Sequence, residues 1–360
     1  MRLGVAAALV DGVPVPGDVS VADGRVEAVG LGGAGAGLAV PGFVDVQVNG
    51  FAGVDFLTAE PEDYARVDRA LAATGVTTYL PTFITAPASD HRRALAVLAA
   101  AGPRRLGAHI EGPFLSPEWP GAHPPEHLRD PDLALVDELR GIGPITTMTV
   151  APELPGGLDL VAALVERGIV VHVGHTDADA ATTHAAFDRG ARALTHIHNA
   201  HRRFRPRDPG PAGVALVRPD VSVTAIVDGV HLAGETAASA WMAARERLCL
   251  ITDAISAAGL GDGTFRLGER KVVVAAGASR LADGTLAGST VTMDRAVREL
   301  VALGASASEA VFAATAAPAR LLGRDDIGRL APGAPADLAV LDDALYVTRT
   351  VVGGVEVFSA

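Results

Sequence analysis

Short apolar runs and helical stretches alternate through the middle of the chain. Each run is rich in Val, Ile or Leu and leads through a polar loop into a segment with helical periodicity. In residues 60–75, for example, Tyr64, Val67 and Leu71 fall on one helical face, and Gly75 follows where the helix should end. The pattern predicts eight strands: Val44–Val48, Thr77–Phe83, Leu106–Glu111, Ile145–Ala151, Ile169–His175, Ala193–His198, Val221–Val227 and Leu248–Asp253.

Alternating strands and helices, with strands apolar on both faces, indicate an α/β protein with a parallel sheet. Eight units between residues 42 and 330 favour a closed (β/α)8 barrel resembling a TIM barrel. A doubly wound open sheet is the alternative, but no glycine-rich dinucleotide fingerprint follows the first strand. We expect a β-hairpin insertion near residues 261–288, after which helices Met293–Leu303 and Ala307–Ala316 close the barrel.

The two ends of the chain share a different pattern, in which short β-type runs are separated by Asp-Gly or Gly-Gly turns. Pro-Gly pairs at positions 41–42 and 332–333 separate these ends from the middle. We therefore predict that residues 1–41 and 331–360 form one small β-domain, a sandwich, beside the barrel of residues 42–330.

Charge and composition narrow the partners. The formal net charge of −12 argues against nucleic acid, which requires a basic surface. No apolar run approaches the 18 or so residues of a membrane span. The single cysteine, Cys249, excludes an intrachain disulfide and a cysteine-based zinc cluster, so we expect a cytoplasmic protein without membrane contact. An anionic substrate would need a local basic pocket, and the one dense basic cluster is Arg202, Arg203, Arg205 and Arg207.

Polar residues collect at the carboxyl ends of the predicted strands. Glu111, His175, His196 and Asp253 end the third, fifth, sixth and eighth strands. In a barrel these ends meet at one mouth, where the active sites of this fold lie. One carboxylate and two imidazoles suit a divalent transition metal, and a separate carboxylate can take a proton from water and return it to a leaving amine. The set therefore predicts metal-assisted hydrolysis.

Taken singly, each of these residues also has a structural explanation. A carboxylate at a strand end can cap the next segment, and His175 precedes Thr176 and Asp177, which resemble a helix cap. Only the joint pattern argues for a site. For the remaining histidines we predict solvated positions (His91, His127 and His184) or satisfied interior ones (His109 and His198).

A set of motifs resembles one family in order and spacing. The motifs are PGFVDVQVNG, HIEGPFLSPEWPGAHPP, VGHTDAD, THIHNA, RDPGPAG, VDGVHL, LITDAISAAG and LAGST. Together they are similar to those of the N-acetylglucosamine-6-phosphate deacetylases, which belong to the amidohydrolase superfamily. The resemblance runs from Pro41 to the IGRLAPGAPADLAVLD segment, which many amidohydrolases share.

The resemblance implies a metal site and a reaction. Glu111, His175 and His196 would hold one divalent metal, zinc or iron, and Asp253 would act as the general acid and base. His231 would lie near the substrate carbonyl and phosphate and assist catalysis. The substrate would be an amino-sugar phosphate, which loses its acetyl group.

The resemblance also implies the remaining substrate contacts. His123 would contact the sugar, while Asn199 and Ala200 would offer backbone N–H groups to the phosphate. Arg207 would reach the phosphate of a neighbouring subunit, which predicts a homodimer because each site would otherwise be incomplete.

Two departures from the family pattern bear on specificity. Gln47 and Asn49 stand where many amidohydrolases have a His-x-His pair for a second metal, which favours a single metal. The segment NAHRRFRPRDPG is also unusual in its residues His198, His201, Arg202, Arg203 and Arg205. These changes either leave the substrate unaltered or shift specificity, for example toward an isomeric substrate such as N-acetylgalactosamine-6-phosphate.

Two other functions compete with deacetylation of a hexosamine phosphate. Another amidohydrolase, of the N-acyl amino acid hydrolase or dihydroorotase type, would use a His-x-His pair or a bridging lysine; the one lysine, Lys271, lies in the insertion. A catalytically silent sugar-phosphate sensor would have lost a ligand or Asp253, and all four residues are present.

Overall fold

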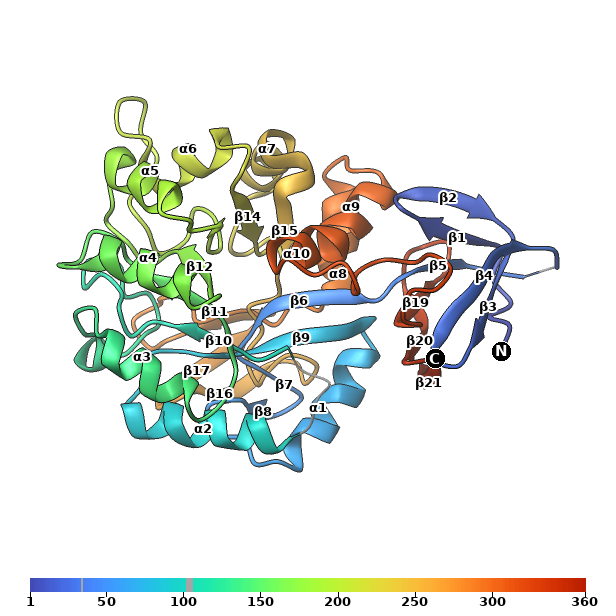
Figure 1. Ribbon diagram of the computed structural model, residues 1–360, viewed down its shortest axis with the longest axis horizontal. Coiled ribbons are helices and arrows are strands. Elements are labelled where there is room, and N and C mark those ends of the chain that lie inside the picture. The colour runs from blue at the N-terminus through green and yellow to red at the C-terminus, as the bar shows by residue number, and fades with distance from the viewer. Residues whose placement is uncertain (34, 102–105) are drawn as a thin grey trace.

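Eight parallel strands form the central sheet of the computed structural model, which describes residues 1–33, 35–101 and 106–360 (Figure 1). Neighbours in the sheet follow chain order from β6 to β15. The two end strands meet through a parallel bridge between Val48 and Ala254, and Asp253 donates its backbone N–H to the Gln47 carbonyl at 2.8 Å. The barrel is therefore closed, as predicted, and the open sheet is excluded. Its strands are β6 (Phe43–Val48), β9 (Val76–Phe83), β10 (Ala108–Glu111), β11 (Ile145–Val150), β12 (Val170–Val173), β13 (Ala193–Leu194), β14 (Ser222–Ala225) and β15 (Leu248–Leu250).

All eight predicted strands are present, but five end earlier than expected, and three of these end before a polar residue that was placed on the strand. β12, β13 and β15 stop before His175, His198 and Asp253. These three residues have positive φ values of 47°, 68° and 47°, which an extended strand cannot contain. The polar residues therefore lie on turns just beyond the strands, where the chain changes direction at the barrel mouth.

Ten helices in the described part of the chain surround the barrel or follow it (Figure 1). On the first helix, Tyr64, Val67 and Leu71 are buried as predicted, and Gly75 adopts φ 81° just after it. A capping box between Ser306 and Glu309 begins α9. The helices are α1 (Asp63–Ala72), α2 (Ala88–Ala100), α3 (Leu133–Arg140), α4 (Gly157–Glu166), α5 (Ala180–Asp188), α6 (Gly210–Val217), α7 (Gly234–Ala244), α8 (Met293–Ala302), α9 (Ala307–Ala314) and α10 (Ala316–Leu321). No helix among the described residues is both long and apolar enough to cross a membrane.

Strands from the two ends of the chain lie together beside the barrel (Figure 1). A six-stranded sheet runs in the order β2-β1-β5-β19-β20-β21, and β3 and β4 pair separately. A shared core that includes Val19, Val26 and Leu338 joins the two layers as a sandwich. The strands are β1 (Ala7–Val10), β2 (Val13–Pro16), β3 (Asp18–Ala22), β4 (Arg25–Leu31), β5 (Leu38–Pro41), β19 (Leu338–Leu341), β20 (Val347–Val352) and β21 (Val355–Ser359).

The insertion after the eighth barrel strand has three strands, one more than the expected hairpin. β16 (Gly263–Leu267), β17 (Arg270–Ala275) and β18 (Ala278–Arg280) form an antiparallel sheet. A turn with positive φ at Ala276 and Gly277 returns the chain for the third strand. A short hairpin of β7 (Gly50–Phe51) and β8 (Val54–Asp55) follows the first barrel strand.

His91 is buried, contrary to the expectation that it is solvated. It lies on the inner face of α2 with Leu95 and Leu98, and its Nε2–H donates to the Ile84 carbonyl at 2.8 Å. Nδ1 has no partner in the described structure. Burial lowers the pKa of His91, so the imidazole is neutral in the fold.

This burial predicts a pH-dependent contribution to stability. The pKa of His91 is lower in the folded than in the unfolded protein. Above the unfolded pKa the ring is neutral in both states, so its burial adds no pH-dependent penalty. As the pH falls below that pKa, only the unfolded protein takes up a proton, and stability is lost. His91→Gln, which keeps an N–H donor, should remove this loss. Between pH 7.5 and 5.5 the wild-type free energy of unfolding should fall by about 1 kcal/mol more than that of the variant, measured by urea denaturation. An equal pH dependence of the two proteins would contradict a neutral His91.

Candidate active site

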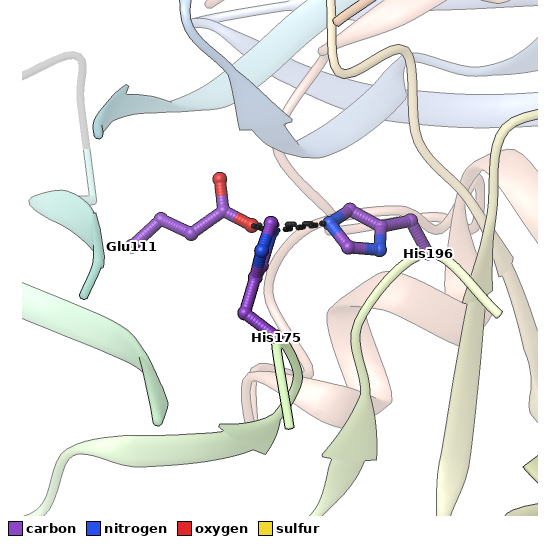
Figure 2. A group of neighbouring side chains, drawn as sticks. All are labelled: Glu111, His175 and His196. Carbon is purple, nitrogen blue, oxygen red and sulfur yellow. Dashed lines mark hydrogen bonds and ion pairs between the residues drawn. The ribbon is translucent and has the colours of Figure 1, made fainter. Parts of the chain in front are cut away.

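Glu111, His175 and His196 form a compact triangle at the barrel mouth (Figure 2). Glu111 Oε1 lies 3.3 Å from His175 Nε2 and 3.2 Å from His196 Nε2, and the two nitrogens are 3.1 Å apart. Ligands bound tetrahedrally to zinc at its usual bond lengths are about 3.4 Å apart. Three buried donor atoms at this spacing, one of them anionic, fit a single divalent metal.

The surroundings give two of the three groups, Glu111 and His175, the protonation states that metal binding requires. His175 Nδ1–H donates to the Trp119 carbonyl at 2.9 Å, which leaves Nε2 with its lone pair toward the triangle. Burial lowers the pKa of His175 to about 4. Burial alone would raise the pKa of Glu111, but the surrounding imidazoles of His123, His175 and His196 hold it well below its ordinary value. The triangle thus combines an ionised carboxylate with a neutral imidazole.

Asp253 lies beside this triangle and is held by two amides. Asn49 Nδ2 donates to Asp253 Oδ1 at 2.7 Å, and Gln47 Nε2 lies 3.2 Å from both Asp253 Oδ1 and Glu111 Oε1. Burial, and then the negative charge of Glu111, raise the pKa of Asp253 to about 6. The amides at the positions of the common His-x-His pair therefore orient two carboxylates, a role that the sequence analysis did not assign.

Two further contacts fix the tautomers of His231 and His123. His231 Nδ1–H donates to Asp228 Oδ2 at 2.8 Å, so its Nε2 is left for the cavity. The Thr85 backbone N–H donates to His123 Nδ1 at 3.2 Å, which places the proton of His123 on Nε2, 3.7 Å from Glu111 Oε2. The sequence analysis missed Asp228 and Thr85. The Asp-Gly-Val-His spacing was the only signal for Asp228.

A cavity of about 410 Å³ opens above the triangle. The predicted residues that line it are Glu111, His123, His175, His196, Asn199, Ala200, His231 and Asp253. Arg207 is exposed and lies outside the lining, whereas Arg203 of the basic cluster lines it, as do Glu118 and Trp119, which were not predicted. The structure thus assembles every predicted site residue except Arg207 within one chain.

The backbone N–H groups of Asn199 and Ala200 differ in their availability. The Asn199 N–H donates to the His196 carbonyl at 3.0 Å, since the positive φ of His198 folds the chain into a tight turn. Asn199 is therefore not the free backbone donor that the resemblance implied. The Ala200 N–H has no acceptor among the described residues and faces the same cavity wall.

Among the histidines predicted to be solvated or interior, His91 and His198 depart from the prediction and the other three do not. His109 is a satisfied interior residue, with Nδ1 3.0 Å from the Val46 carbonyl and Nε2 2.8 Å from Thr149 Oγ1. His127 is partly exposed and His184 is exposed, as predicted. His198 is only half-buried, because it lies on the turn beyond β13 and not inside a strand.

Known proteins resemble this chain along nearly its whole length. The sequence profile of the amidohydrolase family matches residues 38–357. The N-acetylgalactosamine-6-phosphate deacetylase of Escherichia coli O157:H7 is 37% identical over 89% of this chain and 87% of its own length. The N-acetylglucosamine-6-phosphate deacetylase of Homo sapiens is 39% identical over 91% of this chain and 85% of its own.

Solved structures of known proteins are also similar to this chain. A mutant N-acetyl-D-glucosamine-6-phosphate deacetylase from Mycobacterium smegmatis, in complex with N-acetyl-D-glucosamine-6-phosphate, superposes with a TM-score of 0.94 at 39% identity, covering 100% of this chain and 99% of that one. The N-acetylglucosamine-6-phosphate deacetylase of Thermotoga maritima gives 0.93 at 34% identity, covering both chains fully. A triangle of side chains that fits a divalent metal lies at its barrel mouth, and this chain belongs to the amidohydrolase family.

Proposed function

We propose that this chain hydrolyses N-acetylglucosamine-6-phosphate to glucosamine-6-phosphate and acetate, a step in the catabolism or recycling of amino sugars. The observation that carries the proposal is the Glu111–His175–His196 triangle facing Asp253 in one cavity. Three relatives at 34–39% identity, from human, Mycobacterium smegmatis and Thermotoga maritima, are named for this substrate.

The proposed cofactor is one zinc or ferrous ion per chain, held by Glu111, His175 and His196. When bound, the metal polarises the acetamide carbonyl and makes water more acidic. A single ion is supported by Gln47 and Asn49, whose amide groups bond the carboxylates where a second metal would need imidazoles. Imidazole and carboxylate ligands suit either metal.

Asp253 is the proposed general base and general acid. It takes the proton of the attacking water and then delivers it to the departing nitrogen, because an amine is a poor leaving group unless it is protonated. Oδ1 accepts the amide hydrogen bonds of Asn49 and Gln47, which leaves Oδ2 for this proton. A pKa raised to about 6 by burial makes Asp253 a stronger base than an exposed aspartate.

The other lining residues are proposed to orient the substrate. The Nε2 of His231 reaches the region of the acetamide oxygen and the phosphate, and the Asp228 bond to Nδ1 holds the ring in place. His123 donates from Nε2 to the sugar. The Ala200 N–H is the proposed backbone donor to the phosphate, and Asn199 lines the cavity wall beside it.

The proposal extends to a homodimer and a cytoplasmic location. Arg207 is exposed and does not line the cavity of its own chain, which supports a role in the site of a partner subunit. Cys249 is a free, buried thiol, as is usual in a reducing compartment.

The proposal is tested by measuring acetate release from metal-loaded protein. N-acetylglucosamine-6-phosphate should be the best substrate, and unphosphorylated N-acetylglucosamine should be much slower. N-acetylgalactosamine-6-phosphate belongs in the same assay, because one relative of this chain is named for it. A preference for the galacto isomer would replace the substrate and keep the chemistry. No release from any of the three would refute the proposed function.

Metal content provides a second prediction. The purified protein should carry about one zinc or iron per chain, measured by plasma mass spectrometry. His196→Ala should lose most of this metal and its activity, because it removes one corner of the triangle. His198→Ala is the matched control: this half-buried histidine lies two residues away and does not line the cavity, and its variant should keep both. Full metal occupancy in His196→Ala would contradict the ligand set.

Asp253→Asn should retain fold and metal while kcat falls roughly 100- to 10,000-fold. Asparagine preserves the size of the side chain but cannot take up the proton. Steady-state kinetics and metal analysis on the same preparation separate loss of the base from loss of the site. Near-normal turnover would remove Asp253 from its proposed role.

Arg207→Ala should raise KM for the phosphorylated substrate roughly tenfold or more. Turnover of unphosphorylated N-acetylglucosamine should be little changed, because that sugar lacks the anion. Equal losses for the two substrates would contradict a phosphate contact.

A further inference from the structure

The segment between β13 and α6 holds four arginines, but they are in different situations. Arg202 is partly buried and paired, with Nη1 3.2 Å from Asp177 Oδ2 and Nε 2.9 Å from Asp208 Oδ2. Arg205 and Arg207 are exposed and outside the cavity lining. Arg203 lines the cavity, and no carboxylate in the described structure pairs with it. It is therefore the free cation of this segment that faces the site.

Buried His201 determines the path of this segment. Its Nε2 accepts the His198 backbone N–H at 2.8 Å, and its Nδ1–H donates to the Arg202 carbonyl at 3.1 Å. The Arg202 N–H in turn donates to the Thr176 carbonyl at 2.9 Å. The His201 imidazole thus bonds to the backbone at both His198 and Arg202, and the next residue, Arg203, lies at the cavity.

Trp119 provides a support for the Arg203 guanidinium. The Arg203 Cζ lies 5.5 Å from the centre of the indole ring, within the range of a cation–π contact. The indole Nε1–H donates to Asp177 Oδ1 at 2.8 Å, and the same aspartate pairs with Arg202. The ring is therefore fixed from behind, and it limits the positions of the exposed guanidinium at the mouth of the site.

A phosphate bound in this cavity would need a nearby cation to offset the negative charge of the protein. The chain carries a net charge of −12, and Glu118 lines the same cavity. Both disfavour a phosphate. The Arg203 guanidinium donates from Nη1 to the His198 carbonyl at 3.5 Å, and its other N–H groups can still bind two phosphate oxygens at once.

We propose that Arg203 binds the substrate phosphate within its own subunit, in addition to any contact from a partner's Arg207. This inference rests on the proposed function and names a specificity residue for it. The unusual pair His201 and Arg203 then has one explanation: the histidine shapes the loop, and the arginine supplies an anion contact.

The test compares Arg203→Ala with Arg205→Ala, which removes an exposed arginine of the same loop that does not line the cavity. For N-acetylglucosamine-6-phosphate, Arg203→Ala should raise KM roughly 10- to 100-fold with kcat within about twofold. For unphosphorylated N-acetylglucosamine, kcat/KM should stay within about twofold. Inorganic phosphate should also inhibit Arg203→Ala less than wild type. Arg205→Ala should match wild type in all three measurements.

Two results would overturn the inference while leaving the deacetylase intact. One is an unchanged KM for the phosphorylated sugar in Arg203→Ala, and the other is an equal loss for both sugars. A wild-type protein inactive on N-acetylglucosamine-6-phosphate would instead refute the proposed function. Metal content and thermal unfolding of each variant identify any general loss of structure.

Subunit mixing tests whether the contact lies within one chain. Co-expression with Asp253→Asn, which is itself inactive, gives mixed dimers in which the other subunit keeps its base. Such mixing should restore Arg207→Ala, whose missing arginine the Asp253→Asn subunit supplies. It should not restore Arg203→Ala, whose arginine is missing from the active chain. Restoration of Arg203→Ala would place the contact across the interface and overturn the proposal.

Discussion

The closure of the barrel between its first and last strands is the constraint on which the site depends. Asp253 donates its N–H to the Gln47 carbonyl at 2.8 Å, and Asn49 donates its N–H to the Ala254 carbonyl at the same distance. Residues more than 200 positions apart in the chain thereby become neighbours. The same contacts bring the side-chain amides of Gln47 and Asn49 to the carboxylate of Asp253. Without closure, the proposed base would have neither its position nor its partners.

Because Glu111, His175 and His196 are buried, the hydrogen bonds around them are stronger than in water, and a missing partner costs more free energy. Glu111 is 2% exposed, and such a charge needs several donors or a cation. His123, His175, His196 and Gln47 surround it. Two of these groups are held in turn: Thr85 holds His123, and the Trp119 carbonyl holds His175. The outer contacts decide which nitrogen carries the proton, and thus which nitrogen can bind a metal or a substrate.

Trp119 connects the Glu111–His175–His196 triangle to the basic loop. Its carbonyl orients His175, its indole N–H bonds to Asp177, and its ring lies under Arg203. One residue therefore contributes to both the metal triangle and the proposed phosphate contact. The loop and the triangle are thus connected parts of one cavity wall.

The sequence by itself determined the number and order of the barrel strands, because buried parallel strands are apolar along their length. It also predicted that Glu111, His175, His196 and Asp253 lie together, since strand ends must meet in a closed barrel. The tertiary structure alone decided that His91 is buried, that the Asn199 N–H is occupied, and that Arg203 faces the cavity while Arg207 does not. These outcomes depend on turns with positive φ and on contacts between distant segments, and neither leaves a periodic pattern in the chain.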